Sequence, residues 1–311
     1  MKNILTLLII IPIFTFAQSK SGSAKALPLI ESITSDTIKG RFNQLLFEYD
    51  QHKRVISIIK KQINNSIEQI IEKQSFQYNG TDLDPISRKL VLFDFDVKGN
   101  KWNLVLNEYQ YFLYQNGQLV GDSTLYFDKS TQAWTLKYIG TVSNSESSIE
   151  TRVKIPSKKD DEYSDSDIYL DNFYKDDSTR NISDDISEHD YGRSGRDRSF
   201  YKYEKYDEMV NPLNLLNIKN ALANEKLSVT TDGRYGNIAF CWYFMNQNNA
   251  LTLETSTEDF NSSIDEIYRI SYTYNQYNQP VFVKTLVKQS FRRIDKPYKS
   301  YQKHYTFRYK H

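Results

Sequence analysis

The chain has 311 residues and a formal net charge of +1, and 14% of its residues are aromatic. A near-neutral chain without a basic face argues against nucleic-acid binding. The single cysteine, Cys241, excludes an intramolecular disulfide, which a chain of this length does not need in order to bury a sizeable core. Cys241 lies in the apolar run NIAFCWYFM, so we expect a buried, inert thiol.

The first residues, MKNILTLLIIIPIFTFAQSK, predict an export signal. A lysine precedes a mainly apolar run from Ile4 to Phe16, and Thr15 and Ala17 are the small residues before a cut between Ala17 and Gln18. The run is shorter than the roughly 20 residues that a membrane-spanning helix needs. No cysteine follows the cut, so we expect an exported protein without a lipid anchor, in the periplasm, at the cell surface or outside the cell.

Alternation of apolar and polar residues predicts an all-β chain. Ile270, Tyr272 and Tyr274 alternate with polar neighbours, as do Tyr305 and Phe307. Such alternation is typical of antiparallel strands with one buried and one wet face. We predict an antiparallel meander of hairpins that forms a curled open sheet or a barrel-like sheet, with one short helix and a disordered acidic insertion. The expected regions are a signal peptide (1–17), an N-terminal linker (18–34), a first β-hairpin region (35–155), an acidic mobile insertion (156–200) and a second β-hairpin region of the same domain (201–311).

One hairpin pattern occurs twice, more than two hundred residues apart, in FEYDQHKRVISII and SYTYNQYNQPVFVKTL. Phe47 and Tyr49 in the first stretch match Tyr272 and Tyr274 in the second. An Asp or Asn follows each pair, and its side chain can accept a hydrogen bond from the backbone two residues on, which starts a turn. The residues after the turn are predicted to return as the partner strand.

Looser copies of this hairpin lie between the two stretches. LFDFDVKGNKWNLVL contains a Gly-Asn turn, and YFLYQNGQLV contains Asn116-Gly117, a strong hairpin signal. The spacing of the copies is irregular, which disfavours a solenoid or a propeller.

The hairpin unit resembles YD-type repeats. In addition, the order of three stretches resembles that in uncharacterised exported β-proteins of Bacteroidetes: YDEMVNPLNLLN (206–217), QNNALTLE (247–254) and YTYNQYNQPV (272–281). Those proteins form a domain of unknown function with a porin-like or open curled antiparallel sheet. A signal peptide that ends in Phe-Ala-Gln also resembles those proteins. The resemblance implies a fold and an exported location but no mechanism, because that family has no established activity.

The acidic stretch 156–200 interrupts the alternation. Twelve Asp and Glu residues stand against four Lys and Arg between positions 158 and 190. Such a segment lacks the apolar surface that offsets the entropy of ordering, so we expect a mobile loop that a short linker can replace without unfolding the protein. A calcium site is the weaker interpretation. Its ligands would be Asp165, Asp167, Asp171 and Asp176, but Leu170 occupies the position where the calcium loop needs glycine.

The stretch NPLNLLNIKNALANE is the best helix candidate. Asn211 can cap it and Pro212 suits its first position. Leu213, Leu216 and Ala223 are expected to pack against the sheet.

No catalytic, cofactor or metal motif is found, so we predict no enzyme activity, no cofactor and no metal ion. The four histidines lack metal-ligand spacing, and the GDST at 121–124 lacks the Asp-x-x-His of the esterases that it resembles. Three short motifs resemble the O-glycosylation signal of Bacteroidetes and mark Thr37, Ser123 and Ser178 as possible acceptors.

The 24 tyrosines favour a non-catalytic interaction or scaffold module of the cell envelope that binds a protein or a glycan. The alternatives are an outer-membrane β-barrel, which the alternating aromatic strands favour, and a glycan-active enzyme, since paired carboxylates can come from distant segments. Lys, Asn and Gln at many outward positions argue against membrane insertion. The oligomeric state stays open.

Overall fold

The structure is a computed structural model that describes residues 27–37, 40–96, 101–154, 168–176, 178, 181–190, 196–223, 225–229, 241–258, 263–291 and 299–311. The predicted signal peptide and its cleavage site lie outside these residues. The elements are β1 (Leu29–Ser35), β2 (Arg41–Tyr49), β3 (Val55–Asn64), β4 (Ile67–Gln77), β5 (Ser87–Asp96), β6 (Lys101–Gln115), β7 (Gln118–Asp128), β8 (Ala133–Asn144), β9 (Ser148–Lys154), β10 (Ile168–Lys175), β11 (Ile182–Asp190), β12 (Arg196–Val210), η2 (Pro212–Leu215), η3 (Asn217–Lys219), β13 (Lys226–Ser228), β14 (Cys241–Tyr243), β15 (Asn248–Glu258), β16 (Ser263–Tyr274), β17 (Pro280–Phe291) and β18 (Lys299–Lys310).

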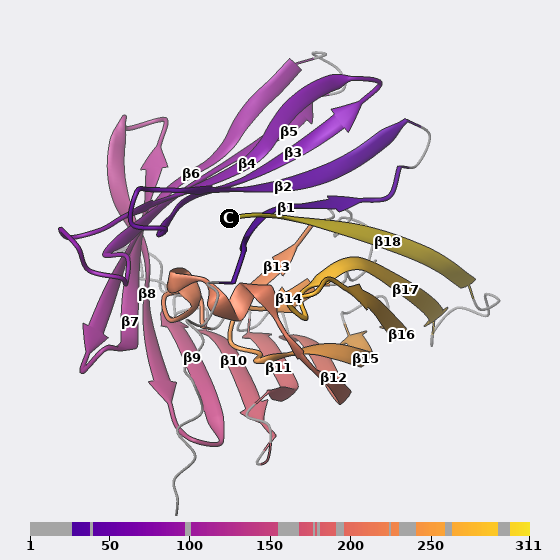
Figure 1. Cartoon of the computed structure of the whole chain (residues 1–311). Coiled ribbons are helices and arrows are strands. Elements are labelled where there is room, and N and C mark those ends of the chain that lie inside the picture. Colours follow the sequence, from indigo (N-terminus) through magenta and orange to yellow (C-terminus); the bar gives the residue numbers. More distant parts are fainter. Residues whose placement is uncertain are drawn as a thin grey trace, which may run out of the picture.

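Within the described residues, 16 antiparallel strands form a closed barrel (Figure 1). Consecutive strands pair with each other, except that β12 pairs with β15, and β1 closes the sheet by pairing with β18. In that closing pair Ile33 lies opposite Phe307. The predicted antiparallel all-β fold is confirmed, whereas the open curled sheet is wrong, because pairing of the first and last strands leaves no free edge on this sheet.

The two matched hairpins have the same turn geometry. The Oδ1 atom of Asp50 accepts hydrogen bonds from the backbone N–H groups two and four residues on, both at 2.9 Å. Asn275 does the same at 2.9 and 3.1 Å. Lys53 and Asn278, three residues after each acceptor, both have positive φ angles, of 61° and 60°. We call the barrel end that carries these turns the turn end.

The prediction that 156–200 is disordered is wrong for the part of it that the structure describes. Strands β10 and β11 and the start of β12 belong to the barrel wall and pair in register with β9 and β15. Phe173 and Ile182 are each only 1% exposed. The sequence of β11 does not alternate between apolar and polar residues, because the charged Asp185 faces inward. There the Tyr243 hydroxyl bonds its carboxylate. The remaining residues of this stretch lie outside the described ranges.

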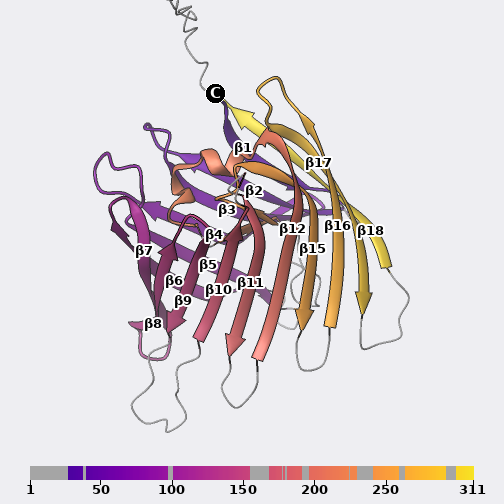
Figure 2. The ribbon, with the colours of Figure 1, turned by 90° about the horizontal axis from the view of Figure 1, so that it is seen from below.

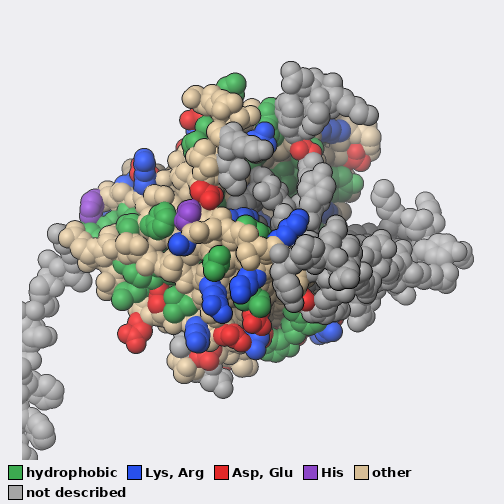
Figure 3. Space-filling view, turned by 90° about the vertical axis from the view of Figure 1, so that its right-hand side faces the viewer, with side chains coloured by type: hydrophobic (Ala, Val, Ile, Leu, Met, Phe, Trp, Pro, Cys, Tyr) green, Lys and Arg blue, Asp and Glu red, His purple; other side chains and the backbone are tan. Residues whose placement is uncertain are grey.

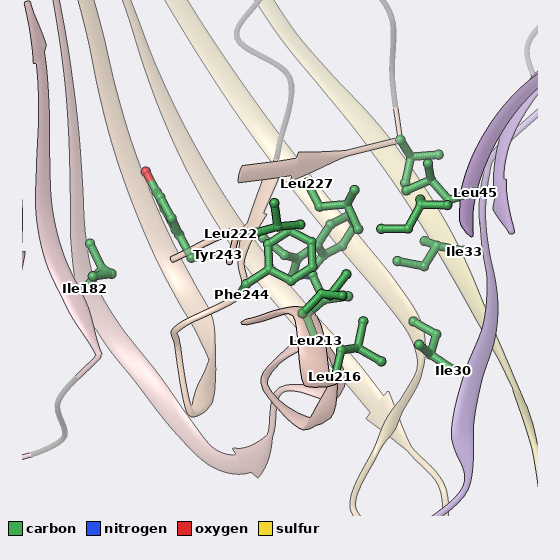
Figure 4. Packing of buried hydrophobic residues seen from close by; sticks show 14 of the residues in the cluster. Ile30, Ile33, Leu45, Ile182, Leu213, Leu216, Leu222, Leu227, Tyr243 and Phe244 are labelled. Atoms are coloured by element: carbon green, nitrogen blue, oxygen red, sulfur yellow. The ribbon is translucent and has the colours of Figure 1, made fainter. Parts of the chain in front are cut away.

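A segment between β12 and β15 lies inside the barrel, and we call it the plug (described residues 211–223, 225–229 and 241–247). It contains η2, η3 and the two-stranded sheet of β13 and β14, and it lies between the β1–β4 wall and the β9–β12 wall (Figures 1 and 2). Leu213 and Phe244 of the plug belong to the same buried apolar cluster as Ile30, Ile33 and Leu45 of the wall (Figure 4). The core therefore sits inside the barrel, at the turn end.

The predicted short helix is two short 3₁₀ helices, separated by the extended residue Leu216. Asn211 does cap the first helix, by accepting a hydrogen bond from the N–H of Leu213 at 3.1 Å, and Pro212 is its first residue. As expected, Leu216 and Ala223 are buried, each 3% exposed.

Phe173 tests the structural role of the acidic stretch. Replacing it by Ala empties a fully buried site in the barrel wall, so the free energy of unfolding should fall by about 3–5 kcal/mol. Asn172→Ala, next to it on the half-buried outer side, should change stability by about 0.5 kcal/mol or less. Urea denaturation of both variants measures this difference. Equal stabilities would show that β10 carries no part of the core.

Candidate functional site

Six tyrosine hydroxyls tie neighbouring strands together at the turn end. Each lies at or near the end of one strand and donates a hydrogen bond to a backbone carbonyl at or near the start of the preceding strand. The pairs are Tyr49 with Ile30 (2.7 Å), Tyr78 with Val55 (2.5 Å), Tyr114 with Pro85 (3.0 Å), Tyr206 with Ile182, Tyr272 with Ala250 (2.9 Å) and Tyr309 with Pro280 (2.7 Å). These tyrosines, which we call the tyrosine set, pack against the core. Part of the tyrosine surplus is therefore structural.

The four repeat aromatics predicted to be structural all lie at the turn end. Phe47 is 3% exposed, and Tyr49 and Tyr272 belong to the tyrosine set. Tyr274 stacks on Tyr272 with ring centroids 5.9 Å apart, and its hydroxyl bonds the carboxylate of Asp207.

Asparagines at every third position hold the two parts of the plug together and fix the plug to the wall. Asn211 and Asn214 donate hydrogen bonds to backbone carbonyls of the returning segment 243–246. Asn217 accepts from the N–H of Val55 at 2.9 Å and donates to the carbonyl of Leu83 at 2.7 Å. This spacing matches the three residues per turn of a 3₁₀ helix. The pattern is visible in the sequence as NPLNLLNIKN, but sequence reasoning used only its first asparagine.

A polar network crosses the lumen from the wall to the plug. Both terminal nitrogens of Arg88 bond the Glu225 carboxylate of the plug at 2.6 Å, and Arg88 also bonds Gln74, which in turn bonds Glu72 at 2.8 Å. Burial lowers the pKa of Lys60, opposed by the nearby Glu72 carboxylate. Burial disfavours the charged Arg88, but Glu225 holds its pKa above the ordinary value. Because the charges are paired, the network anchors the plug.

A fully buried carboxylate lies on the β16 side of the lumen. Glu266 is fully buried and accepts hydrogen bonds from the hydroxyls of Tyr268 (2.5 Å) and Tyr301 (3.1 Å) and from the amide of Gln289 (2.9 Å). Three donors stabilise a carboxylate without water. Among the described residues, no group of three or more His, Cys, Asp or Glu side chains is placed to hold a metal ion.

The possible glycosylation residues do not come together. Thr37 is exposed beyond β1, Ser178 is exposed and bonds the Asp176 carboxylate, and Ser123 is half-buried on β7. Their modification stays a prediction. Of the weaker calcium interpretation, Asp165 and Asp167 lie outside the described residues.

The outer surface of the wall carries charged side chains on some strands and mainly large apolar ones on others. On β12 and β15–β17 charged side chains occupy exposed positions in mid-strand, among them Lys202, Glu254, Arg269, Lys284 and Lys288. Figure 3, which looks onto the right-hand side of Figure 1, shows charged side chains interspersed with hydrophobic ones on the described part of that face.

On the outer surface of β6–β8 large apolar side chains gather, and we call this group the outer aromatic patch. Its residues are Val105, Tyr109, Tyr111, Leu113, Phe127, Trp134, Leu136 and Ile139. Tyr111 is 48%, Leu113 63% and Ile139 48% exposed. The Trp134 ring packs edge-on against Tyr109 and Phe127, with centroids 4.8 and 5.4 Å apart. The sequence carried a signal for this patch, since NEYQYFLYQ has aromatic residues on both faces of one strand.

No family model matches the chain, and no curated protein matches it. It is similar to the crystal structures of two porin-like proteins, from Bacteroides uniformis (10% identity, TM-score 0.47, 90% of this chain and 96% of that one) and from Bacteroides vulgatus (10% identity, TM-score 0.47, 91% and 98%). A protein with unknown function from Bacteroides fragilis covers 40% of this chain and 84% of its own, with 13% identity and a TM-score of 0.29. The resemblance to YD-type repeats stays a prediction. Among the described residues, no helix is long and apolar enough to cross a membrane.

Asn217→Ala tests the anchoring of the plug. It leaves the buried N–H of Val55 without its acceptor, so the free energy of unfolding should fall by about 1–3 kcal/mol. Asn64→Ala, at an exposed strand end, should change it by about 0.5 kcal/mol or less. Chemical denaturation compares the two variants. Equal losses would mean that the asparagine contacts do not hold the plug.

Alkaline pH should weaken the fold through the buried tyrosines. Burial raises the pKa of Tyr78 to about 12, from 10.0 in an exposed tyrosine. The unfolded chain therefore releases this proton first, so the contribution is complete below pH ~10 and is lost as the pH rises towards ~12. Urea denaturation across this window should give a shallower fall in stability for Tyr78→Phe than for the unmodified chain. Equal slopes would contradict the assignment.

Proposed function

We propose that the chain is an exported, non-catalytic interaction module that binds a protein partner in the cell envelope through the outer aromatic patch. One observation carries the proposal: large apolar side chains gather on the outer surface of β6–β8, while other parts of the wall expose charges. Exposed apolar patches of this kind are typical of protein or membrane interaction sites. Export itself rests on the predicted signal peptide.

A protein partner fits the patch better than a glycan. Aliphatic side chains, including Leu113, Leu136 and Ile139, stand beside the aromatic rings, and they offer sugar hydroxyls no hydrogen bonds. Aromatic anchors with apolar neighbours are typical of the centre of protein interfaces. Lys89 lies 5.2 Å from the centroid of the Tyr109 ring and gives the patch a polar border on the β5 side.

Insertion into the outer membrane is the second candidate, because the sheet is closed and the patch is apolar. Against it, Arg269, Lys284 and Lys288 occupy exposed mid-strand positions on β16 and β17. A lysine or arginine on the lipid face of a barrel costs about 2–4 kcal/mol at the bilayer midplane. The packed apolar core inside the barrel also contrasts with the polar lumen of a porin.

The double variant Tyr111→Ser/Ile139→Ser tests the patch. The two side chains flank Ser123 in one row across β6, β7 and β8. The matched control is Phe282→Ser/Leu286→Ser, which removes two exposed apolar side chains of β17 (38% and 39% exposed). Capture of proteins from envelope extract, compared by quantitative mass spectrometry, should show a partner whose binding falls about tenfold or more in the patch variant only.

The melting temperatures of both variants should stay close to that of the unmodified protein, because all four side chains are exposed. A partner set that is unchanged by the patch variant would refute the proposed surface. Retention of the protein in membranes after a carbonate wash would favour the second candidate instead.

A further inference from the structure

A pocket of about 300 Å³ opens at the turn end, where the plug meets the barrel rim. Four separate parts of the chain line it: the β8–β9 turn, the end of β10, the 3₁₀ helices of the plug and the returning segment before β15. The lining residues are Glu146, Lys175, Asn214, Lys219, Met245 and Gln247. Its volume is at the lower end of the range for small-molecule sites.

Three polar side chains of this rim pocket, those of Lys175, Asn214 and Lys219, are held in place by hydrogen bonds. The ammonium of Lys175 donates to Asn144 Oδ1 and to the carbonyl of Ser145, both at 2.8 Å. The Asn214 amide donates to two backbone carbonyls of the plug, at 3.2 and 3.0 Å, and its oxygen accepts from Lys219 at 3.3 Å. A ligand that enters therefore loses little free energy in ordering the site.

The charge of the pocket selects the ligand. Its charged lining residues are Lys175, Lys219 and Glu146, so the lining carries a formal excess of one positive charge. Lys219 has three N–H groups, one of which reaches Asn214, and the others suit an anionic oxygen. Met245 supplies an apolar wall, while Asn214 and Gln247 supply amides.

We propose that the rim pocket binds a small molecule that carries a carboxylate or phosphate group, bound by Lys219 within the positive field that Lys175 reinforces. This site is separate from the outer aromatic patch, which lies on the outer surface of β6–β8, so either can fail without the other. The pocket gives the module a small-molecule ligand in addition to its protein partner.

Methyl NMR of methionine-labelled full-length protein reads the site directly. Met245 lines the pocket and Met209, at the end of β12, does not, so the second methyl group is an internal control. Inorganic phosphate and glucuronate test the two anions, and glucose is the neutral probe. The Met245 signal should shift saturably with at least one anion and not with glucose, while Met209 stays unchanged.

Lys219→Gln should weaken this binding about tenfold or more, and Lys284→Gln, on the outer wall, should leave it unchanged. Both lysines lie outside the core, so both variants should melt like the unmodified protein. The proposal is overturned if neither anion shifts Met245 saturably. It is equally overturned if the shift survives Lys219→Gln, or if Lys284→Gln reduces it as much, because screening of general surface charge would then explain it.

Discussion

Sixteen strands enclose a space that the wall side chains cannot fill, and much of this structure follows from the segment that occupies it. Wall side chains fill a barrel of about eight strands by themselves, but about sixteen strands enclose more space than they can occupy. Here the plug supplies the missing volume. Its Leu213 and Phe244 pack with wall residues such as Ile33 into one apolar cluster. Many inward positions near the plug are accordingly apolar. The charged residues among them, such as Lys60 opposite Leu45 and Arg88 opposite Phe76, lie beside oppositely charged side chains.

Filling the barrel buries backbone groups, and these need partners. Asparagine and tyrosine provide them, since an amide both donates and accepts and a phenol joins an apolar ring to a hydroxyl. Asn217 satisfies the backbone of β3 and of the loop after β4, and the tyrosine set satisfies carbonyls near strand starts. Asparagine and tyrosine, whose abundance suggests a binding surface, therefore serve largely to satisfy buried backbone groups. The binding sites that we propose are the outer aromatic patch and the rim pocket.

The positions of both proposed sites follow from the packed interior of the barrel. Among the described residues the core region is packed with apolar side chains, so we propose that recognition takes place at the outer surface of the wall and where the plug meets the rim. The patch offers apolar area with few charges of its own, whereas the rim pocket offers fixed ammonium groups around a small volume. Surfaces of such different chemistry suit different partners, which is why we assign a protein to one and a small anion to the other.

The sequence by itself determined the antiparallel strands and the matched turns, because alternation at Tyr272 and Tyr274 and the capping of backbone by Asp50 and Asn275 are local effects. Only the tertiary structure decided the rest. Closure depends on pairing β1 with β18 across almost the whole chain, which no local pattern records. In the acidic stretch the inward-facing Asp185 bonds Tyr243 of the plug, a contact between segments far apart in the sequence. The patch and the rim pocket each combine side chains from separate strands and turns. These residues are far apart in the sequence, so only the closed barrel shows that they are neighbours.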